Sequence, residues 1–332
     1  MGLPNRDLDR RGLLRAAVGA TVAIGAAALA GATPALAAAS TSPATADRSA
    51  SLTIPMGSIG IQLYSVRDKV AQLGFRVVFE TLAQMGYKEV EFAGYTQNTS
   101  ILGRQITVPE IRQLLDDNGL RAIGSHVDLG TWAAGLDQQL DYAEILGMKH
   151  VGTANAPSNT ETVSAYLSAS ELFNTYGEAA AARGLMFYQH NHYPEFAFAT
   201  DQPSVRLYDV FLANTDPRYV FLEMDVYWAY VGQYRYPGFD PAAYVRAHPH
   251  RYPMFHMKDG APNPDNPNGY DIVEFGAGDL PYKSFIHAIG PRGVHLPIWE
   301  QDTAVNTLPN PPGSFASAQR SLTAIDDLLS KH

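Results

Sequence analysis

Two histidines and a glutamate lie close together within residues 188–195, directly after an apolar run. Three later segments follow the same design, in which a short apolar stretch ends on a side chain that can bind a metal; these end residues are Asp225, His256 and Glu300. Imidazole and carboxylate groups suit a hard or borderline divalent ion that keeps positions open for water or substrate. We therefore expect four segment ends to meet around one divalent metal ion.

The fourth ligand should come from the segment that ends near residue 190. His190 is the candidate by position, and Glu195 is the chemical alternative if its loop folds inward. A metal held in this way can bind adjacent sugar oxygens and polarise a carbonyl, which stabilises the enediolate formed when a neighbouring C–H proton is removed. The base must be a carboxylate or imidazole within hydrogen-bond reach of that proton. The candidates for this base are Glu300, Glu195 and His192.

Other residues could contact a substrate. Lys258 follows His256 by two positions, so it should lie on the same face of its strand. It can hold a substrate oxygen or stabilise an oxyanion, and a structural ion pair with Glu223 or Asp225 is the alternative. Trp228 offers an aromatic plane to the C–H face of a sugar, against simple packing at the rim. The remaining predicted substrate contacts, from the first three strands, are Gln62, Tyr64, Glu91 and His126.

The elements that must position these residues alternate regularly along the chain. Apolar segments at 59–64, 88–92, 121–127, 150–153, 185–190, 219–225, 254–257 and 295–300 predict strands. Helices are predicted at 70–85, 108–118, 136–146, 162–183, 204–214, 241–248, 282–289 and 315–329.

Eight strand–helix repeats over about 275 residues match the size of a single (β/α)₈ TIM barrel. Residues 57–332 should form this one domain. The competing fold, a doubly wound open sheet, is disfavoured because no G-x-G-x-x-G pattern follows the first strand. In such a barrel the functional side chains lie at the C-terminal ends of the strands. The turn-rich residues 259–270 should form a long loop over that end.

The first residues are predicted to direct the chain out of the cell. Arg10 and Arg11 precede an Ala/Gly-rich apolar run, and residues 35–37 read A-L-A, a cleavage signal. The paired arginines resemble a twin-arginine signal peptide over residues 1–37, followed by a disordered tether over 38–56. The apolar run is too short and weak for a stable membrane span. The sequence thus predicts export to an extracellular or periplasmic location.

Composition excludes several functional classes. The chain has 332 residues and a formal net charge of −9, which argues against a nucleic acid partner. The same charge disfavours a nuclease of the related endonuclease barrel type, which needs a basic groove. Cysteine is absent, so disulfides, zinc–thiolate sites and thiol nucleophiles are excluded. A small-molecule sugar is the expected partner, and the sequence leaves a homo-oligomer open.

The chain resembles the xylose isomerase-like barrels that are grouped as sugar phosphate isomerases/epimerases. The resemblance spans residues 59–329 and is carried by residues 59–67, 86–91, 190–192, 195–196, 225–228, 256–259, 274–278 and 300–302. It implies one manganese, cobalt, zinc or magnesium ion held by the strands numbered five to eight. The matching positions in this chain are His190, Asp225, His256 and Glu300.

One position departs from the family pattern. Epimerases of the family have a glutamate on strand five and use it with the strand-eight glutamate as a pair of bases, whereas this chain has His190. The first hypothesis is a metal-dependent isomerase or epimerase of a non-phosphorylated or oxidised sugar. The second is a lyase or hydrolase that removes a proton beside the 3-keto group of a glycoside and expels the aglycone. The third is a sugar-binding barrel without catalytic activity.

Overall fold

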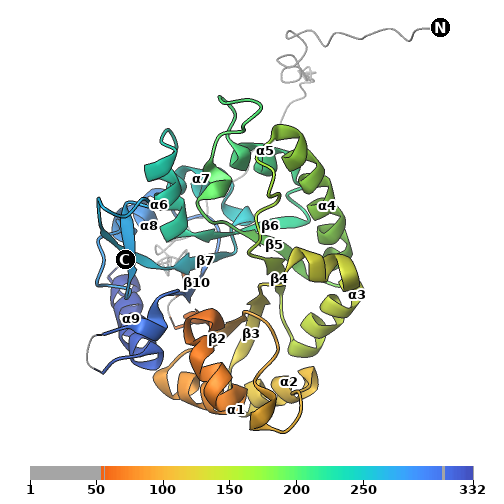
Figure 1. The fold of residues 1–332 in the computed structure, drawn as a ribbon, viewed down its shortest axis with the longest axis vertical. Coiled ribbons are helices and arrows are strands. Elements are labelled where there is room, and N and C mark those ends of the chain that lie inside the picture. The colour runs from red at the N-terminus through yellow and green to blue at the C-terminus, as the bar shows by residue number, and fades with distance from the viewer. Residues whose placement is uncertain (1–53, 56, 309–310, 332) are drawn as a thin grey trace, which may run out of the picture. The chain divides into compact units, whose positions relative to one another are not determined.

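The computed structural model describes residues 54–331 apart from 56, 309 and 310. Its barrel strands are β1 (Gly60–Gln62), β2 (Glu89–Phe92), β3 (Arg121–Ser125), β4 (His150–Thr153), β5 (Met186–His190), β6 (Val220–Asp225), β7 (Met254–Met257) and β10 (Leu296–Trp299). They form one parallel sheet in the order β3-β2-β1-β10-β7-β6-β5-β4. Figure 1 shows these strands at the centre, with helices around them.

The two ends of this sheet meet and nearly close it. β3 and β4 are joined by an isolated parallel bridge between His126 and Gly152. Next to it, the N–H of Val127 donates to the carbonyl of Gly152 at 2.9 Å. The fold is therefore a single (β/α)₈ barrel, which confirms the fold class predicted from the alternating pattern.

Helices connect the strands. They are α1 (Arg67–Met85), α2 (Val108–Asp117), α3 (Leu129–Leu146), α4 (Val163–Ala181), α5 (Leu207–Asn214), α6 (Val226–Arg235), α7 (Pro241–Ala247), α8 (Tyr282–Ile289) and α9 (Ser314–Leu329). Short 3₁₀ turns are η1 (Leu63–Val66), η2 (Thr99–Ile101), η3 (Pro194–Phe196), η4 (Pro249–Arg251) and η5 (Ala304–Asn306). Local signals set the boundaries, as in α2, where Thr107 and Glu110 form a reciprocal capping box.

The first strand is shorter than predicted. Strand pairing stops at Gln62, and the chain turns into η1 instead of continuing to residue 64. The Gln62 side chain fixes this turn, because its Oε1 accepts the N–H of Tyr64 at 3.1 Å. Tyr64 is consequently 41% exposed.

Other segments also differ from the sequence prediction, among them α3, which begins at Leu129 after the Asp128 cap and not at residue 136. Helix α6 was not expected; it begins directly after β6 because Asp225 caps it, with Oδ1 accepting the N–H of Trp228 at 2.8 Å. The segment 259–270, predicted as a loop, contains β8 (Asp259–Pro262), which pairs antiparallel with β9 (Tyr270–Val273). Only the tip of this hairpin is a loop, and it is closed by an Asn263–Gly269 backbone hydrogen bond of 2.8 Å.

The interior of the barrel is polar at the C-terminal ends of the strands and apolar farther towards their N-terminal ends. Ile123, Tyr188, Met254 and Ile298 form a small buried cluster. Tyr188 and Met254 each precede a histidine by two positions, so they share a strand face with His190 and His256. A second, larger apolar cluster includes side chains of both the strands and the surrounding helices. The polar residues of the barrel interior thus pack against a layer of buried apolar side chains.

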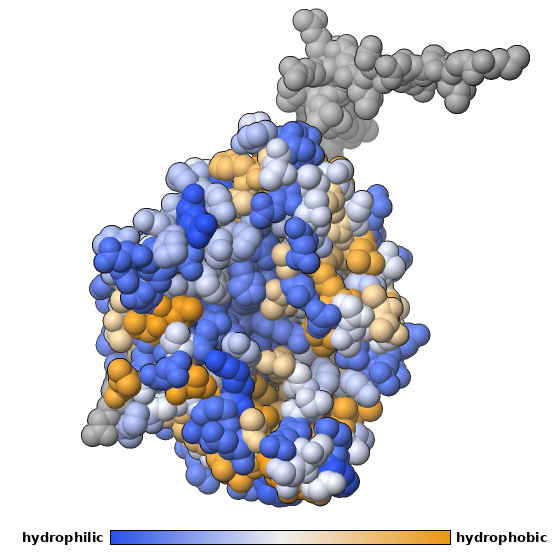
Figure 2. All heavy atoms as spheres, viewed as in Figure 1, coloured by the Kyte–Doolittle hydropathy of each residue, from blue (hydrophilic) through white to orange (hydrophobic). Residues whose placement is uncertain are grey.

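Other sequence predictions concern the chain ends. The predicted signal segment 1–37 and most of the predicted tether 38–56 lie outside the described residues. Across the described residues, no helix is both long enough and apolar enough to cross a membrane. In the orientation of Figure 1, Figure 2 shows hydrophilic residues gathered around a hollow over the middle of the barrel.

Candidate metal centre

Neighbouring strands place the predicted ligands side by side. In the sheet register, His190 on β5 lies opposite Glu223 on β6, and Asp225 lies opposite His256 on β7. Glu223 and Asp225 are two positions apart, so both side chains point to the same face of β6. Glu300 directly follows β10. These register relations bring side chains from four strands to one end of the barrel.

Four of these residues form what we call the strand-end group: His190, Asp225, His256 and Glu300. One donor atom from each lies within 4.8 Å of all the others. All four residues are buried. Nδ1 of His256 is 2.9 Å from Oε2 of Glu300. Oδ2 of Asp225 stays farther from the imidazoles, at 3.8 Å from Nε2 of His190 and 3.9 Å from Nδ1 of His256.

The strand-end group fits a divalent cation. Oδ2 of Asp225 is buried and accepts no hydrogen bond, although Nζ of Lys258 lies 3.1 Å away. A buried carboxylate oxygen is costly without partners, and the one ammonium near this atom is shared with Glu300 and Asp302. Two carboxylates and two imidazoles are a donor set that zinc, manganese and related ions accept.

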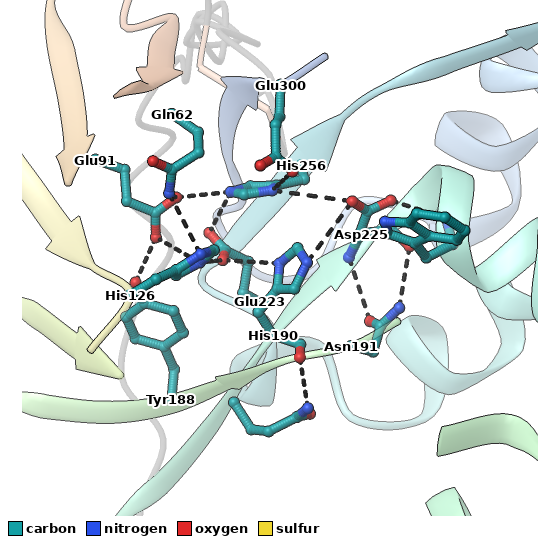
Figure 3. Close-up of polar contacts among 12 residues, drawn as sticks. Gln62, Glu91, His126, Tyr188, His190, Asn191, Glu223, Asp225, His256 and Glu300 are labelled. Carbon is teal, nitrogen blue, oxygen red and sulfur yellow. Dashed lines mark hydrogen bonds and ion pairs between the residues drawn. The ribbon is translucent and has the colours of Figure 1, made fainter. Parts of the chain in front are cut away.

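A second set of donors lies immediately beneath, and we call it the inner group: His126, His190, Glu223 and His256. These donor atoms also lie within 4.8 Å of one another. Oε2 of Glu223 is 2.8 Å from Nε2 of His126 and 3.2 Å from Nδ1 of His190. Glu91 adjoins this group, with its Oε2 2.6 Å from Nε2 of His256. Figure 3 shows the His256 ring between Glu91 on one side and Asp225 on the other.

The inner carboxylates are held ionised. Burial would raise the pKa of Glu91, but His126 and His256 outweigh burial and hold that pKa well below its usual range. Burial and Glu91 oppose ionisation of Glu223, yet His256, His126 and His190 lower its pKa to about 2. The pKa of His126 rises to about 10, because Glu91 and Glu223 outweigh burial. Burial and the neighbouring His256 depress the pKa of His190 well below its usual value, so this imidazole is neutral.

Lys258 contacts the strand-end group from the side. Its Nζ lies 3.1 Å from Oδ2 of Asp225, 2.8 Å from Oε2 of Glu300 and 2.8 Å from Oδ2 of Asp302. Burial would lower the pKa of Lys258, but the three carboxylates raise it well above its usual value. Burial raises the pKa of Asp225 to about 6, with Lys258 opposing this rise. The ion pair considered as an alternative for Lys258 therefore exists, and it involves Asp225.

His192 and Glu195, the two other predicted bases, lie in different surroundings. The His192 ring is 4.9 Å from the His190 ring and 5.6 Å from the Trp228 ring, centroid to centroid. Burial, with Lys258 nearby, lowers the pKa of His192 to about 4, so its imidazole is neutral. Glu195 instead accepts the N–H of His192 at 3.1 Å and the Gln189 amide at 3.3 Å. Among the described residues, His190 and not Glu195 lies with the other three donors.

The predicted substrate contacts fall into two places. Nε2 of Gln62 donates to Glu91 at 2.9 Å and lies 3.4 Å from Nδ1 of His126, so these three residues belong to the inner network. Trp228 lies against His192, and its indole nitrogen is buried without a hydrogen-bond partner. Tyr64 is exposed, with the Arg67 guanidinium 4.0 Å from its ring centroid.

Sequence reasoning did not assign a site role to Glu223, Asn191 or Asp302. Glu223 could have been found from the period of two, since it precedes Asp225 by two positions on the same strand. The Asn191 amide exchanges hydrogen bonds of 3.2 Å with the backbone of Asp225, which fixes that residue. Asp302 lies beyond the end of β10, where no strand period applies.

Known proteins were compared with the chain. A family model described as "Xylose isomerase-like TIM barrel" matches residues 79–323. No curated protein matches. A solved sugar phosphate isomerase/epimerase from Parabacteroides distasonis ATCC 8503 is 23% identical, with a TM-score of 0.64, over 86% of this chain and 98% of that one.

Two further solved structures show the same fold at lower identity. The IolI protein, solved with a bound zinc atom, is 13% identical with a TM-score of 0.61, over 82% of this chain and 98% of that one. The probable 3-DHS dehydratase AsbF from Bacillus anthracis is 13% identical with a TM-score of 0.58, over 81% of this chain and 98% of that one.

Proposed function

The chain belongs to the xylose isomerase-like TIM barrel family, and from this premise we propose that it is a divalent-metal-dependent sugar isomerase or epimerase. The observation that carries the proposal is the strand-end group, in which Oδ2 of Asp225 is buried among two imidazoles and a second carboxylate and accepts no hydrogen bond. His190, Asp225, His256 and Glu300 would hold manganese, cobalt, zinc or magnesium. When bound, such an ion supplies Lewis-acid polarisation of a sugar carbonyl.

The residues of the chain would handle the proton. His192 is neutral, since its pKa is lowered to about 4 by burial and by Lys258. A ring nitrogen of His192 can therefore take the proton from the carbon beside the carbonyl, leaving an enediolate. Glu300 is held ionised by Lys258 and His256, which outweigh burial and depress its pKa. Its carboxylate is the second group that could remove or return a proton. Glu195 faces the Gln189 amide and the backbone of His192, which makes it the weakest of the predicted bases.

We propose a non-phosphorylated or oxidised sugar as substrate. A phosphate group would need cationic side chains whose charge is not already neutralised by neighbouring carboxylates. The ammonium of Lys258 already lies within 3.1 Å of three carboxylates. The site therefore favours a ligand without a phosphate group. Trp228, beside His192, offers its ring to the C–H face of a sugar.

Export of the protein remains a proposal that rests on the sequence of residues 1–37 alone. A twin-arginine route fits a metalloprotein, because that route carries folded chains. A sugar met outside the cytoplasm would also be unphosphorylated. The two proposals therefore support each other without depending on the same residues.

The histidine on β5 favours a second candidate, a lyase or hydrolase of 3-keto-glycosides. His190 gives the strand-end group a neutral imidazole in place of a second base of the carboxylate type. Elimination needs one base to remove the proton beside the keto group, and the electron pair then expels the aglycone. His192 alone could serve as that base, whereas epimerisation needs a proton to be returned on the other face of the carbon.

One experiment separates these functions. The protein would be incubated with manganese and a panel of free sugars and 3-keto-glycosides in deuterated water. Deuterium in a recovered isomer supports the isomerase or epimerase, and released aglycone supports the lyase or hydrolase. If neither product forms while sugar still binds, the chain is a non-catalytic sugar-binding barrel and both proposals are wrong. The Glu300→Gln variant serves as the inactive control.

A further inference from the structure

His256 and His190 belong to both the strand-end group and the inner group, and both rings have a carboxylate near each nitrogen. His256 directs Nδ1 to Glu300 at 2.9 Å and Nε2 to Glu91 at 2.6 Å. His190 directs Nε2 towards Asp225 at 3.8 Å and Nδ1 to Glu223 at 3.2 Å. Each ring thus has one nitrogen facing the proposed metal position and the other facing a buried carboxylate. Figure 3 shows both rings in this bridging position.

We propose that Glu91 and Glu223 are positioning residues that fix the tautomers of the two histidine ligands. Glu91 keeps the proton of His256 on Nε2, so Nδ1 is free for the ion. Glu223 keeps the proton of His190 on Nδ1, so Nε2 is free for the ion. The inner group is therefore a hydrogen-bonded support for one metal and not a second metal site. This inference rests on the proposed metal site and deepens it.

The contacts of Glu91 with His256 and of Glu223 with His126 have the distances of hydrogen bonds. Two ligands of one tetrahedral ion, each about 2.0–2.1 Å from it, lie roughly 3.3 Å apart. The 2.6 Å between Glu91 and His256 and the 2.8 Å between Glu223 and His126 are shorter than that. They are the distances of hydrogen bonds to a charged acceptor. A proton therefore fits between the atoms of these two pairs. Oε1 of Glu223 is buried without a hydrogen bond and lies 3.3 Å from Nε2 of His256, so the number of zinc ions bound decides whether a second ion lies there.

The inner carboxylates are themselves held rigidly. The amide of Gln62 donates to Oε2 of Glu91 at 2.9 Å, and the hydroxyl of Tyr188 donates to Oε1 of Glu91. Nε2 of His126 lies 2.8 Å from Glu223. Both glutamates are fully buried. A fixed acceptor on the distal nitrogen orients the ring of a histidine ligand and increases its basicity, so we expect both carboxylates to contribute to metal affinity.

The test compares the affinity of graded variants for zinc. Glu223→Gln keeps an acceptor oxygen and loses the charge, while Glu223→Leu loses both. The affinity for zinc, measured by titration against a competing chelator, should fall a few-fold in the first variant and about 10–100-fold in the second. Glu91→Gln should behave like Glu223→Gln. Equal affinity in wild type and Glu223→Leu would overturn the inference.

Glu89→Gln is the matched control. Glu89 is at the other end of β2 from the metal, is also buried, and pairs with Arg121. Its substitution removes a buried glutamate charge from the same strand and should leave zinc affinity unchanged. A loss in Glu89→Gln as large as in Glu91→Gln would mean that general destabilisation, and not support of the ligand, lowers affinity.

Two further readouts follow from the geometry. Nitrogen-15 spectra of the zinc-loaded protein should show a retained N–H on Nδ1 of His190 and on Nε2 of His256; the opposite tautomers would overturn the inference. Wild type and His126→Ala should each bind one zinc. Two zinc ions in wild type and one in His126→Ala would instead make the inner group a metal site. A wild-type protein that binds no divalent ion would overturn the proposed metal site itself.

Discussion

The two carboxylate oxygens of Asp225 have different partners. Oδ1 accepts the N–H of Trp228 and so begins helix α6, whereas Oδ2 faces the strand-end group without a hydrogen bond. The same residue thus links a helix boundary to the proposed cation. An asparagine at this position can keep the cap with its amide oxygen, which separates the two roles.

We predict that Asp225→Asn loses the metal but keeps the fold. Metal affinity should drop more than about 100-fold, because the loss of a direct ligand exceeds the 10–100-fold typical of outer partners. Metal content by elemental analysis and helical content by circular dichroism check this. Full metal occupancy in the variant would show that Asp225 is not a ligand.

Glu195 should make stability depend on pH. Burial raises the pKa of this carboxyl from its ordinary value of 4.5 to about 7. The folded state therefore binds more protons than the unfolded state between these values, and stability falls as pH rises from about 4.5 to about 7. The contribution is on the order of 3 kcal/mol.

Glu195→Gln should remove this pH dependence. Denaturant unfolding of wild type and variant at about pH 5, 6, 7 and 8 would measure the pH dependence of the free energy of unfolding. The free energy of unfolding of the variant relative to wild type should increase towards high pH. Parallel curves for the two proteins would contradict the assignment.

At the scale of elements, the contact between β4 and β5 leaves no room for a side chain at residue 152. A Cβ added to Gly152 would lie 2.2 Å from the carbonyl oxygen of Tyr188 and 2.6 Å from its Cγ. The backbone of β5 would have to move, and Tyr188 is the residue whose hydroxyl donates to Glu91. The glycine is therefore required by close strand packing.

We predict that Gly152→Ala destabilises the protein by at least the roughly 1–3 kcal/mol typical of overpacking. Thermal unfolding should show a melting temperature several degrees lower, at about 2–4 °C per kcal/mol for a domain of this size. Gly135→Ala is the control, because a Cβ there meets only the Gln138 side chain at 3.8 Å. Equal melting temperatures for the two variants would contradict this account.

The sequence predicts elements whose apolar residues recur with a clear period. It does not predict where a side-chain hydrogen bond ends or begins an element. Apolar runs ending in His190, Asp225, His256 and Glu300 predicted four residues that the structure brings together. The early end of β1 depends on one hydrogen bond that the Gln62 side chain accepts from the N–H of Tyr64, which no propensity reveals. Helix α6 depends on a cap by Asp225, whose residue type is equally that of a metal ligand, so the sequence does not separate the two roles.

The pairing of buried charges was equally hard to predict. Glu223 and Glu91 lie far apart in the chain, and their shared contact with His256 arises only when the barrel closes. Asp302 reaches Lys258 from a turn without regular structure. Such contacts depend on tertiary geometry, so composition and spacing could not show them.

At the scale of the whole molecule, a bound ion should stabilise the barrel. The proposed ligands come from four strands, so only the folded chain can bind with all of them. Saturation with manganese at about 100 times its dissociation constant should add about 2.7 kcal/mol to the free energy of unfolding. Differential scanning calorimetry with and without chelator checks this, and Asp225→Asn should show no shift. An equal shift in both proteins would place the ion elsewhere.

The strand order also dictates when the site can form during synthesis. β10, the last barrel strand in the chain, pairs with β1 on one side and with β7 on the other. On the other side of the sheet, β3 and β4 are joined by the bridge between His126 and Gly152 and by the hydrogen bond from the N–H of Val127 to the Gly152 carbonyl. A ribosome-bound chain that ends before β10 therefore lacks the strand that closes the barrel and one of the proposed ligands. Metal loading must wait for a nearly complete translation product.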